Sequence, residues 1–270
     1  MTRMCAVGDN VIDWYPQEQL VFPGGSAANA AVFASRLGVE ASYIGILGSD
    51  EHAQLIESSL CTEGVDVSFA QRHDEPSSRT DVLIDESGNR TFTAFIPPVS
   101  RIQLDAATRS HLKGAAWIHT GHSSFTEPLL ADLAELGDVS FDFSKKDLDY
   151  AEPLLPFVRY AAFSREEMSV DDAVNLVQTV AASGVQYALV TRGGEGAVAT
   201  TPEGTFVQSA APAEVLDTIG AGDAFQTCFI SHLVAGSPPV DALHAASKFA
   251  AEVCGYRGAF GHGQRFALTV

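Results

Sequence analysis

A glycine-rich turn followed by an acid lies in the last quarter of the chain, between Val215 and Phe225. Gly220, Ala221 and Gly222 are small, so the backbone there can approach a ligand closely. The apolar residues that follow recur every three or four positions, which predicts a helix whose first amides have no internal partner. Such amides, together with the helix dipole, bind anions such as phosphate.

Asp223 directly follows these small residues. A carboxylate beside an anion site is repelled unless it has a chemical task, and abstraction of a proton from a substrate hydroxyl is such a task. Adjacent amides would then hold the charge that develops on a transferring phosphoryl group, which is typical of a kinase. An N-capping Asp223 after a loop, with Asp217 and Thr218 as ordinary turn residues, is the structural alternative.

A second polar constellation lies near the N-terminus. A short apolar run leads into a loop that carries Asp13, and Gly24 and Gly25 open a helix that carries Asn29. Close backbone approach at the glycines and an amide that both donates and accepts hydrogen bonds suit the hydroxyls of a sugar. A glycine turn, a solvent-facing Asn29 and a solvated loop acid are the alternative interpretation.

Together these stretches resemble the two signatures of the ribokinase family, the pfkB-type carbohydrate kinases. The string Asp217–Asp223 resembles the C-terminal signature, in which the last Asp is the catalytic base, and Gly24, Gly25 and Asn29 resemble the N-terminal Gly-Gly-x-x-x-Asn motif. The resemblance extends from Gly8 to about Phe260. It implies an ATP-dependent phosphotransferase in which Asp13 receives sugar hydroxyls.

The resemblance also implies a nucleotide side. Ser164 and Glu167 fall where the family has Asn-x-x-Glu, a motif linked to the magnesium water shell and the phosphates, with Ser in place of Asn. Further ATP contacts are implied for four residues: Thr191, Gly193, Gly196 and Lys248. The loop at 255–260 matches one that in some members helps to bind a monovalent cation such as K⁺. First-turn helix charges, a glycine hairpin and a surface lysine are the ordinary alternatives.

Within the family, the residues around Asp13, Phe141–Ser144 and Tyr256–Phe260 look most like the fructoselysine 6-kinase branch. Those kinases phosphorylate the 6-hydroxyl of a fructosamine, and a carboxylate such as Asp9 or Glu18 would suit its ammonium group. A fructokinase, a ribokinase and a nucleoside kinase stay open as alternatives. A non-catalytic sugar-binding protein would have no use for a base, and a nicotinamide dehydrogenase would need a Gly-x-Gly-x-x-Gly that the first strand lacks.

The elements that must position these residues alternate between strand-like and helix-like segments. From residue 105 onward the alternation predicts a mostly parallel sheet with helices on both faces, a ribokinase-like three-layer α/β/α fold in one domain over residues 1–270. Short alternating segments without helices, at about 13–22 and 67–98, predict a small β-sheet lid. Arg79, Arg90 and Phe92 lie in this lid and either face substrate or are surface residues of a hairpin.

Composition narrows the class of partner. The 270 residues carry a formal net charge of -18, which disfavours nucleic acid and anionic membranes as partners. The 4 cysteines are far apart and form no metal or redox pattern. No signal peptide or membrane-spanning run is evident, so we expect a cytoplasmic protein. The resemblance further implies ATP and Mg²⁺ as cofactors, a small sugar or fructosamine as substrate, and a homodimer formed through the lid.

Overall fold

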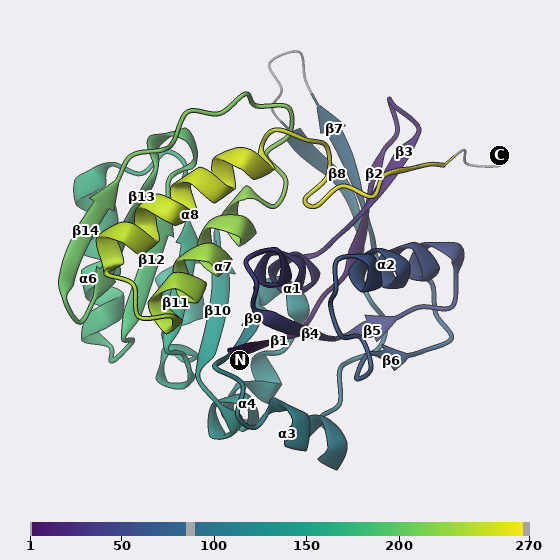
Figure 1. Ribbon diagram of the computed structural model, residues 1–270, viewed down its shortest axis with the longest axis horizontal. Coiled ribbons are helices and arrows are strands. Elements are labelled where there is room, and N and C mark those ends of the chain that lie inside the picture. The colour runs from purple at the N-terminus through teal and green to yellow at the C-terminus, as the bar shows by residue number, and fades with distance from the viewer. Residues whose placement is uncertain (1, 85–89, 267–270) are drawn as a thin grey trace.

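A central sheet of eight strands forms the body of the computed structural model, which describes residues 2–84 and 90–266 (Figure 1). Its spatial order is β14-β13-β12-β11-β10-β9-β1-β4. All neighbouring strands from β12 to β4 run parallel, and β13 and β14 are added antiparallel at one edge. The strands are β1 (Arg3–Val7), β4 (Glu40–Ile44), β9 (Trp117–Gly121), β10 (Val139–Ser144), β11 (Tyr160–Ser164), β12 (Tyr187–Thr191), β13 (Ala197–Thr201) and β14 (Gly204–Gln208).

Helices cover both faces of this sheet because successive side chains of a buried strand point to opposite faces. In β1, Met4 and Ala6 pack in one cluster with α1, whereas Cys5 and Val7 pack in the cluster on the other face. The first face is covered by α1 (Ser26–Arg36), α7 (Ala221–Val234) and α8 (Pro239–Val253), and the second by α3 (Ala106–Leu112), α4 (Leu130–Leu136) and α6 (Val170–Ala182). The predicted three-layer α/β/α fold is therefore confirmed.

A second sheet stands off one end of the first, where the lid was expected, and is called the lid sheet or lid (Figure 1). Its order is β15-β3-β2-β7-β8, made from β2 (Val11–Tyr15), β3 (Leu20–Gly24), β7 (Arg79–Ile84), β8 (Arg90–Ile96) and β15 (Gln264–Arg265). Asp13 pairs with Thr80, which pairs with Phe95. Paired residues project from the same face of a sheet, so these three share one face and Trp14, Arg79 and Ile96 share the other.

Two features of the lid differ from the sequence-based expectation. Val67–Ala70 forms a turn rather than a strand, and the chain then forms β6 (Gln71–Arg72), which pairs with β5 (Ile46–Leu47) outside the lid sheet. Conversely, β15 joins the lid by pairing with β3, although no strand was expected so close to the C-terminus. Two-residue strands leave no alternating pattern in a sequence, which is why both escaped prediction.

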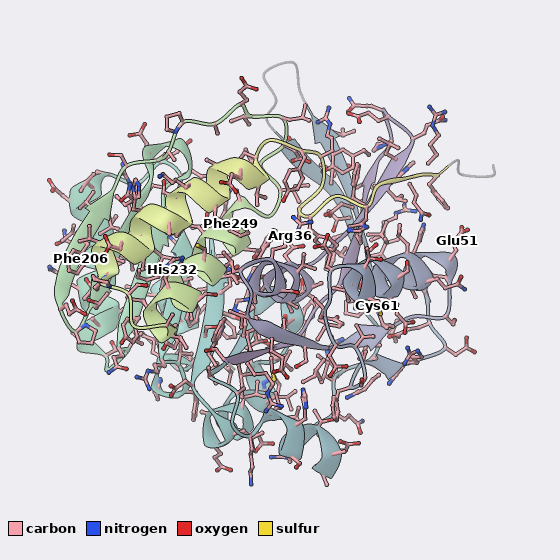
Figure 2. The ribbon with its side chains drawn as sticks, viewed as in Figure 1. Arg36, Glu51, Cys61, Phe206, His232 and Phe249 are labelled. Atoms are coloured by element: carbon pink, nitrogen blue, oxygen red, sulfur yellow. The ribbon has the colours of Figure 1, made fainter. Side chains whose placement is uncertain are left out.

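The segment that leads to β15 is tied to the body by Arg36, at the end of α1 (Figure 2). Its guanidinium donates to both carboxylate oxygens of Glu63, at 2.8 and 2.6 Å, and to the carbonyl of Phe260 at 2.8 Å. Glu63 follows α2 (Glu51–Thr62) and also contacts His262 Nε2 at 2.7 Å. The paired Arg36 guanidinium lowers the pKa of Glu63, which keeps the carboxylate charged and the segment attached.

The remaining helical segments are short. They are α5 (Leu148–Ala151) and the 3₁₀ turns η1 (His122–Ser124), η2 (Glu127–Leu129), η3 (Leu155–Phe157) and η4 (Gly193–Glu195). Among the residues that the structure describes, no helix is long and apolar enough to cross a membrane.

Candidate active site

The candidate site lies at the carboxyl ends of the central strands, where β1 is flanked by β4 on one side and β9 on the other. The chain leaves β1 for β4 and later returns on the opposite side as β9. Open α/β sheets bind their ligands at such a switch point, outside the carboxyl ends of the strands, and we name this region the crevice. Asp9 follows β1, and Asp142 lies near the end of β10. The amino ends of α1 and α7 face this crevice and bring Asn29 and Asp223 into it.

Asp223 is held by side chains from the opposite helix. Its Oδ1 accepts from Ser26 Oγ at 2.8 Å, and its Oδ2 accepts from Asn29 Nδ2 at 2.7 Å. Gln226, one helical turn further along α7, donates weakly to Oδ1 at 3.3 Å. The carboxylate is therefore fixed in orientation before any substrate binds.

The charge state of Asp223 is unusual for an aspartate. Burial, and next the negative charge of Asp142, raise its pKa to about 7, although the hydrogen bonds from Asn29 and Ser26 oppose the shift. Burial likewise raises the pKa of Asp142 to about 6. A carboxyl group with a pKa near 7 can both take up and release a proton at neutral pH, which suits a general base.

The glycine-rich turn has the geometry that an anion site needs. Gly220 is left-handed (φ 76°), and an added Cβ would lie 2.6 Å from the Cβ of Ala259, so both the conformation and the packing require glycine. The amide of Ala221 donates to Thr218 at 3.3 Å. The amides of Gly222 and Asp223 have no acceptor among the described residues. The beginning of α7 thus presents unpaired donors next to the Asp223 carboxylate.

The sugar-side residues lie around the same point. Asp13 and Asn29 are buried (5% and 4% exposed), and a Cβ added to Gly24 would lie 2.6 Å from Asp13 Oδ2 and 3.8 Å from Asn29 Oδ1. Asn29 Oδ1 has no hydrogen-bond donor among the described residues. Gly25 precedes α1 directly. A side chain at Gly24 would collide with the Asp13 carboxylate, so glycine is required there, and the acceptor oxygens of Asp13 and Asn29 lie on the same side of it, an arrangement that suits a ligand rich in donors.

Two acids that the sequence offered for a substrate ammonium already have partners within the chain, and their contact with an ammonium group stays a prediction. Asp9 accepts the amides of Ser26 at 2.8 Å and Ala27 at 3.3 Å, and therefore caps α1. Glu18 pairs with Arg257 at 2.7 Å. Local capping explains Asp9, because Gly25 has no side chain with which to cap the helix itself.

Of the two arginines predicted in the lid, Arg79 has a described side chain and Arg90 does not. Arg79 lies on the lid face opposite to Asp13, where its guanidinium stacks 5.0 Å from the Trp14 ring and pairs with Asp81 at 2.9 Å. The pleat turns it away from the crevice, so Arg79 does not face substrate in this structure. Arg90 begins β8, but its side chain and that of Phe92 lie outside the described residues.

The predicted nucleotide-side residues line the neighbouring strand ends. Ser164 and Thr191 are the last residues of β11 and β12 and pair in register. Gly193 begins η4 and Gly196 follows it, and Lys248 is exposed on α8. Thr191 Oγ1 donates to the Phe163 carbonyl at 3.4 Å, so it contacts the neighbouring strand rather than another of these residues.

Glu167 is an exposed acid between β11 and α6. Within residues 2–84 and 90–266, no group of three or more His, Cys, Asp or Glu side chains is close enough to hold a metal ion. An isolated exposed carboxylate fits a magnesium ion that arrives with the nucleotide and keeps most of its water, rather than a preformed metal cage.

Sequence reasoning missed three groups of the site. Ser26 is hidden in a string of small residues, and His122 follows β9 in a loop without a motif. Burial and the positive charge of Lys146 lower the pKa of His122, so its ring is neutral at pH 7. Gln226 could have been found, because it lies three residues after Asp223 and therefore on the same helix face.

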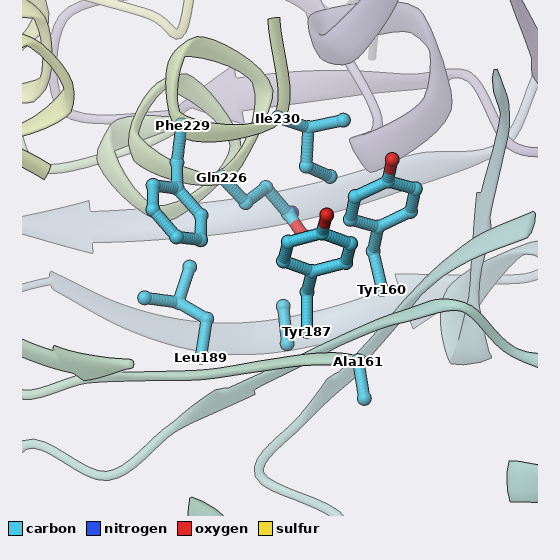
Figure 3. Close-up of a pocket in the computed structure, with 8 residues that line it drawn as sticks. Tyr160, Ala161, Tyr187, Leu189, Gln226, Phe229 and Ile230 are labelled. Atoms are coloured by element: carbon cyan, nitrogen blue, oxygen red, sulfur yellow. The ribbon is translucent and has the colours of Figure 1, made fainter. Parts of the chain in front are cut away.

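Behind Gln226 lies a cavity of about 10 Å³, between α7 and the sheet (Figure 3). Stacked Tyr160 and Tyr187, together with Phe229, form part of its wall. It has room for about one water molecule and none for a sugar. Gln226 Oε1 lacks a donor among the described residues, so a water in this cavity would complete its hydrogen bonds.

Comparisons with known proteins identify the family and the fold of the chain. Residues 1–261 match the profile of the pfkB family carbohydrate kinases. The chain is 35% identical to fructosamine kinase FrlD of Bacillus subtilis (98% of this chain, 95% of that protein) and 29% identical to fructoselysine 6-kinase of Escherichia coli (96% and 100%). Its fold is similar to that of Arabidopsis thaliana ribokinase, solved with ribose and ATP (TM-score 0.79, 19% identity, 97% and 96% covered).

Proposed function

The chain belongs to the pfkB family of carbohydrate kinases and is an ATP-dependent sugar kinase, and from this premise we propose that it phosphorylates the 6-hydroxyl of fructoselysine or a related fructosamine. The names of its relatives support the fructosamine substrate. The crevice adds a physical reason, since Asp13, Asn29 and Asp142 offer acceptor oxygens to a donor-rich ligand that carries an ammonium group.

Asp223 is the proposed base, and the observation that carries this assignment is its carboxylate, held by Ser26 and Asn29 with a pKa raised to about 7. The Asp223 carboxylate takes the proton of the 6-hydroxyl as that oxygen forms a bond to the γ-phosphorus of ATP. The bond from this phosphorus to the bridging β–γ oxygen breaks, and ADP leaves with that electron pair. The amides of Gly220–Gly222 hold the charge that builds on the transferring group.

ATP is proposed to lie along the ends of β11 and β12. Its phosphates are bordered by Ser164, Thr191, Gly193 and Gly196, and its adenine ring is bordered by Lys248 on α8. Glu167 is placed to accept hydrogen bonds from the water shell of Mg²⁺. Mg²⁺ would supply neutralisation of the phosphate charges, while the chain positions the nucleotide.

A monovalent cation such as K⁺ and a lid-mediated homodimer complete the proposal. The Asp217 carboxylate near the 255–260 loop already accepts from Tyr15 Oη at 2.6 Å and from the amides of Ile219 and Gly258, each at 3.0 Å. Because the Asp217 carboxylate is occupied, the binding of K⁺ would depend on the backbone carbonyls of this loop. A dimer would use the outer lid face, where Ile96 is 46% exposed beside Trp14 and Arg79.

The proposed function is tested by turnover with Mg-ATP and a panel of fructoselysine, fructose, ribose and adenosine, with ADP release as the signal. We expect fructoselysine to give the highest kcat/KM, about ten- to a hundredfold above fructose, because of one charge-assisted contact. Phosphorus NMR of the product should place the phosphate on O6. Equal efficiency on both sugars would overturn the fructosamine assignment and favour a fructokinase; no turnover would favour a sugar-binding protein.

A further inference from the structure

Arg101 and Phe125 form a stacked pair at the edge of the crevice. Phe125 directly follows Ser124, whose hydroxyl donates to Asp9 Oδ1 at 2.7 Å, and Asp9 caps the helix that carries Ser26. The backbone of Phe125 is left-handed (φ 54°), a conformation that a bulky residue keeps only where its surroundings fix it. The Arg101 guanidinium lies 4.7 Å from the ring centroid. A fixed ring therefore holds a cation beside the site.

The guanidinium of Arg101 is anchored but not neutralised. Its Nη1 donates to the carbonyls of Pro98 at 3.0 Å and Ser100 at 3.1 Å, and it has no carboxylate partner among the described residues. Six other arginines do have carboxylate partners: Arg36, Arg72, Arg79, Arg109, Arg159 and Arg257. In a chain of net charge -18, an exposed arginine without an acid has spare capacity for an anionic ligand.

The lid adds an exposed aromatic side chain, Phe95, on the strand that leads to this cation. Phe95 shares the lid face of Asp13 and Thr80, two strands away from Asp13, yet it is 53% exposed. Strands lie about 4.8 Å apart, so the Phe95 ring is roughly 10 Å from the position proposed for the sugar hydroxyls. The chain then runs from Phe95 to Arg101 in six residues. An alkyl chain attached to the sugar would pack on the Phe95 ring before it reaches the Arg101 guanidinium.

We propose that Phe95, Arg101 and Phe125, the mouth cluster, bind the amino-acid end of the fructosamine substrate, with Arg101 receiving its carboxylate. This inference rests on the proposed function. The aliphatic part of the amino acid packs on Phe95, and the planar guanidinium, held flat on Phe125, pairs with the carboxylate. The enzyme thereby distinguishes an amino-acid-linked fructosamine from one formed with a simple amine.

The test compares fructoselysine with fructosyl-cadaverine, which differs from it by lacking only the carboxylate. In Arg101→Ala we expect the KM for fructoselysine to rise about five- to tenfold with kcat unchanged, since one charge-assisted hydrogen-bonded pair is lost at an exposed site. The KM for fructosyl-cadaverine should stay at its wild-type value. Arg101→Lys should recover part of the loss, and Arg72→Ala, which removes an exposed arginine from β6, is the matched control.

Unchanged fructoselysine kinetics in Arg101→Ala, or an equal rise in KM for both compounds, would overturn the inference while leaving the kinase assignment intact. Activity on fructosyl-cadaverine also shows that the variant is folded. If the wild type phosphorylates neither compound but does phosphorylate fructose, the proposed substrate itself is wrong, and that failure is visible before any variant is made.

Discussion

The two halves of the crevice are built differently. On the sugar side, Asp223 is joined to Ser26 and Asn29 by hydrogen bonds of 2.8 and 2.7 Å that link helices nearly two hundred residues apart in the chain. On the nucleotide side, Glu167 and Lys248 are exposed on separate elements without comparable mutual bonds. The proposed base is therefore held in place before substrate binds, whereas the groups proposed for ATP are free to adjust to it.

This difference predicts where each mutation acts. On the sugar side, a mutation removes contacts that orient Asp223 for the transition state, so we expect it to lower kcat. A change on the adjustable side weakens the binding of a nucleotide that several groups hold together, and therefore raises KM for ATP. The variants below are ordered by the size of the expected effect.

Asp223→Asn should have the largest effect. The amide keeps the shape and the contacts near Ser26 but cannot accept the substrate proton, so we expect kcat to fall by about 10²–10⁴-fold. Calorimetric titration with Mg-ATP should give the wild-type Kd, because the nucleotide is held by other groups. Wild-type turnover in this variant would show that Asp223 is not the base.

Asn29→Ala should come second. Its amide donates to Asp223 Oδ2 and lowers the pKa of that carboxyl group, so its removal leaves a less oriented and more basic Asp223. We expect kcat to fall about tenfold at pH 7, in proportion to about one hydrogen bond to a charged group. The rate should recover partly by pH 8.5, because the raised pKa shifts the active carboxylate form to higher pH.

Asn175→Ala is the control for this variant, since Asn175 is exposed on α6, away from the crevice. It should leave both kcat and the pH–rate profile unchanged. A loss in Asn29→Ala that is the same at every pH from 6 to 9 would mean that Asn29 acts only by binding the sugar.

The sequence predicted the long periodic elements and the residues that belong to short motifs. The helix that starts at Ala221 and the alternation of strands and helices were predicted because their periodicity is long and regular. The motif residues Asp13, Asn29 and Asp223 do converge in the structure. Ser26 and His122 escaped prediction because their positions depend on how two helices and a strand end meet, and neither their type nor their spacing encodes that.

The acids near Asp13 show the same limit. Asp9 lies four residues before Asp13, and the sequence offered it, like Glu18, for an ammonium contact. Its carboxylate instead satisfies the amides of Ser26 and Ala27 across a turn. Which of two nearby acids caps a helix and which faces a ligand is decided by backbone direction. Only the three-dimensional structure reveals that direction.

Glu167→Gln tests the adjustable side, and its effect should be smaller. Removing one exposed charge near the proposed magnesium water shell should raise KM for Mg-ATP about three- to tenfold, while kcat and the sugar KM change little. Glu166→Gln is the matched control, because Glu166 is the adjacent acid and its carboxylate pairs with Lys145 at 3.4 Å. A large fall in kcat for Glu167→Gln would contradict the division between the two sides.

The smallest expected effect concerns stability, and it follows from the carboxyl groups that the sugar side crowds together. Asp142 and Asp223 have pKa values raised from 3.8 to about 6 and about 7, mainly by burial. A carboxyl group whose pKa is higher in the folded than in the unfolded state stabilises the fold most below its unfolded pKa. That contribution is lost as pH rises through 6 and then 7, so the wild-type Tm should fall between pH 5 and 8.

Asp142→Asn should reduce this fall. The neutral side chain removes a negative charge beside Asp223, and its oxygen can still accept the amide of Ser144, which donates to Asp142 at 2.7 Å. Scanning calorimetry at pH 8 should show a rise of a few degrees over wild type, given about 2–4 °C per kcal/mol for a chain of this size. At pH 5 the two proteins should differ little. Glu195→Gln, which neutralises an exposed acid of the nucleotide side, should follow the wild-type profile. If Asp142→Asn and Glu195→Gln shift Tm alike, the charge of Asp142 beside Asp223 does not lower the stability of the fold. The electrostatic strain inferred for the sugar side would then be absent.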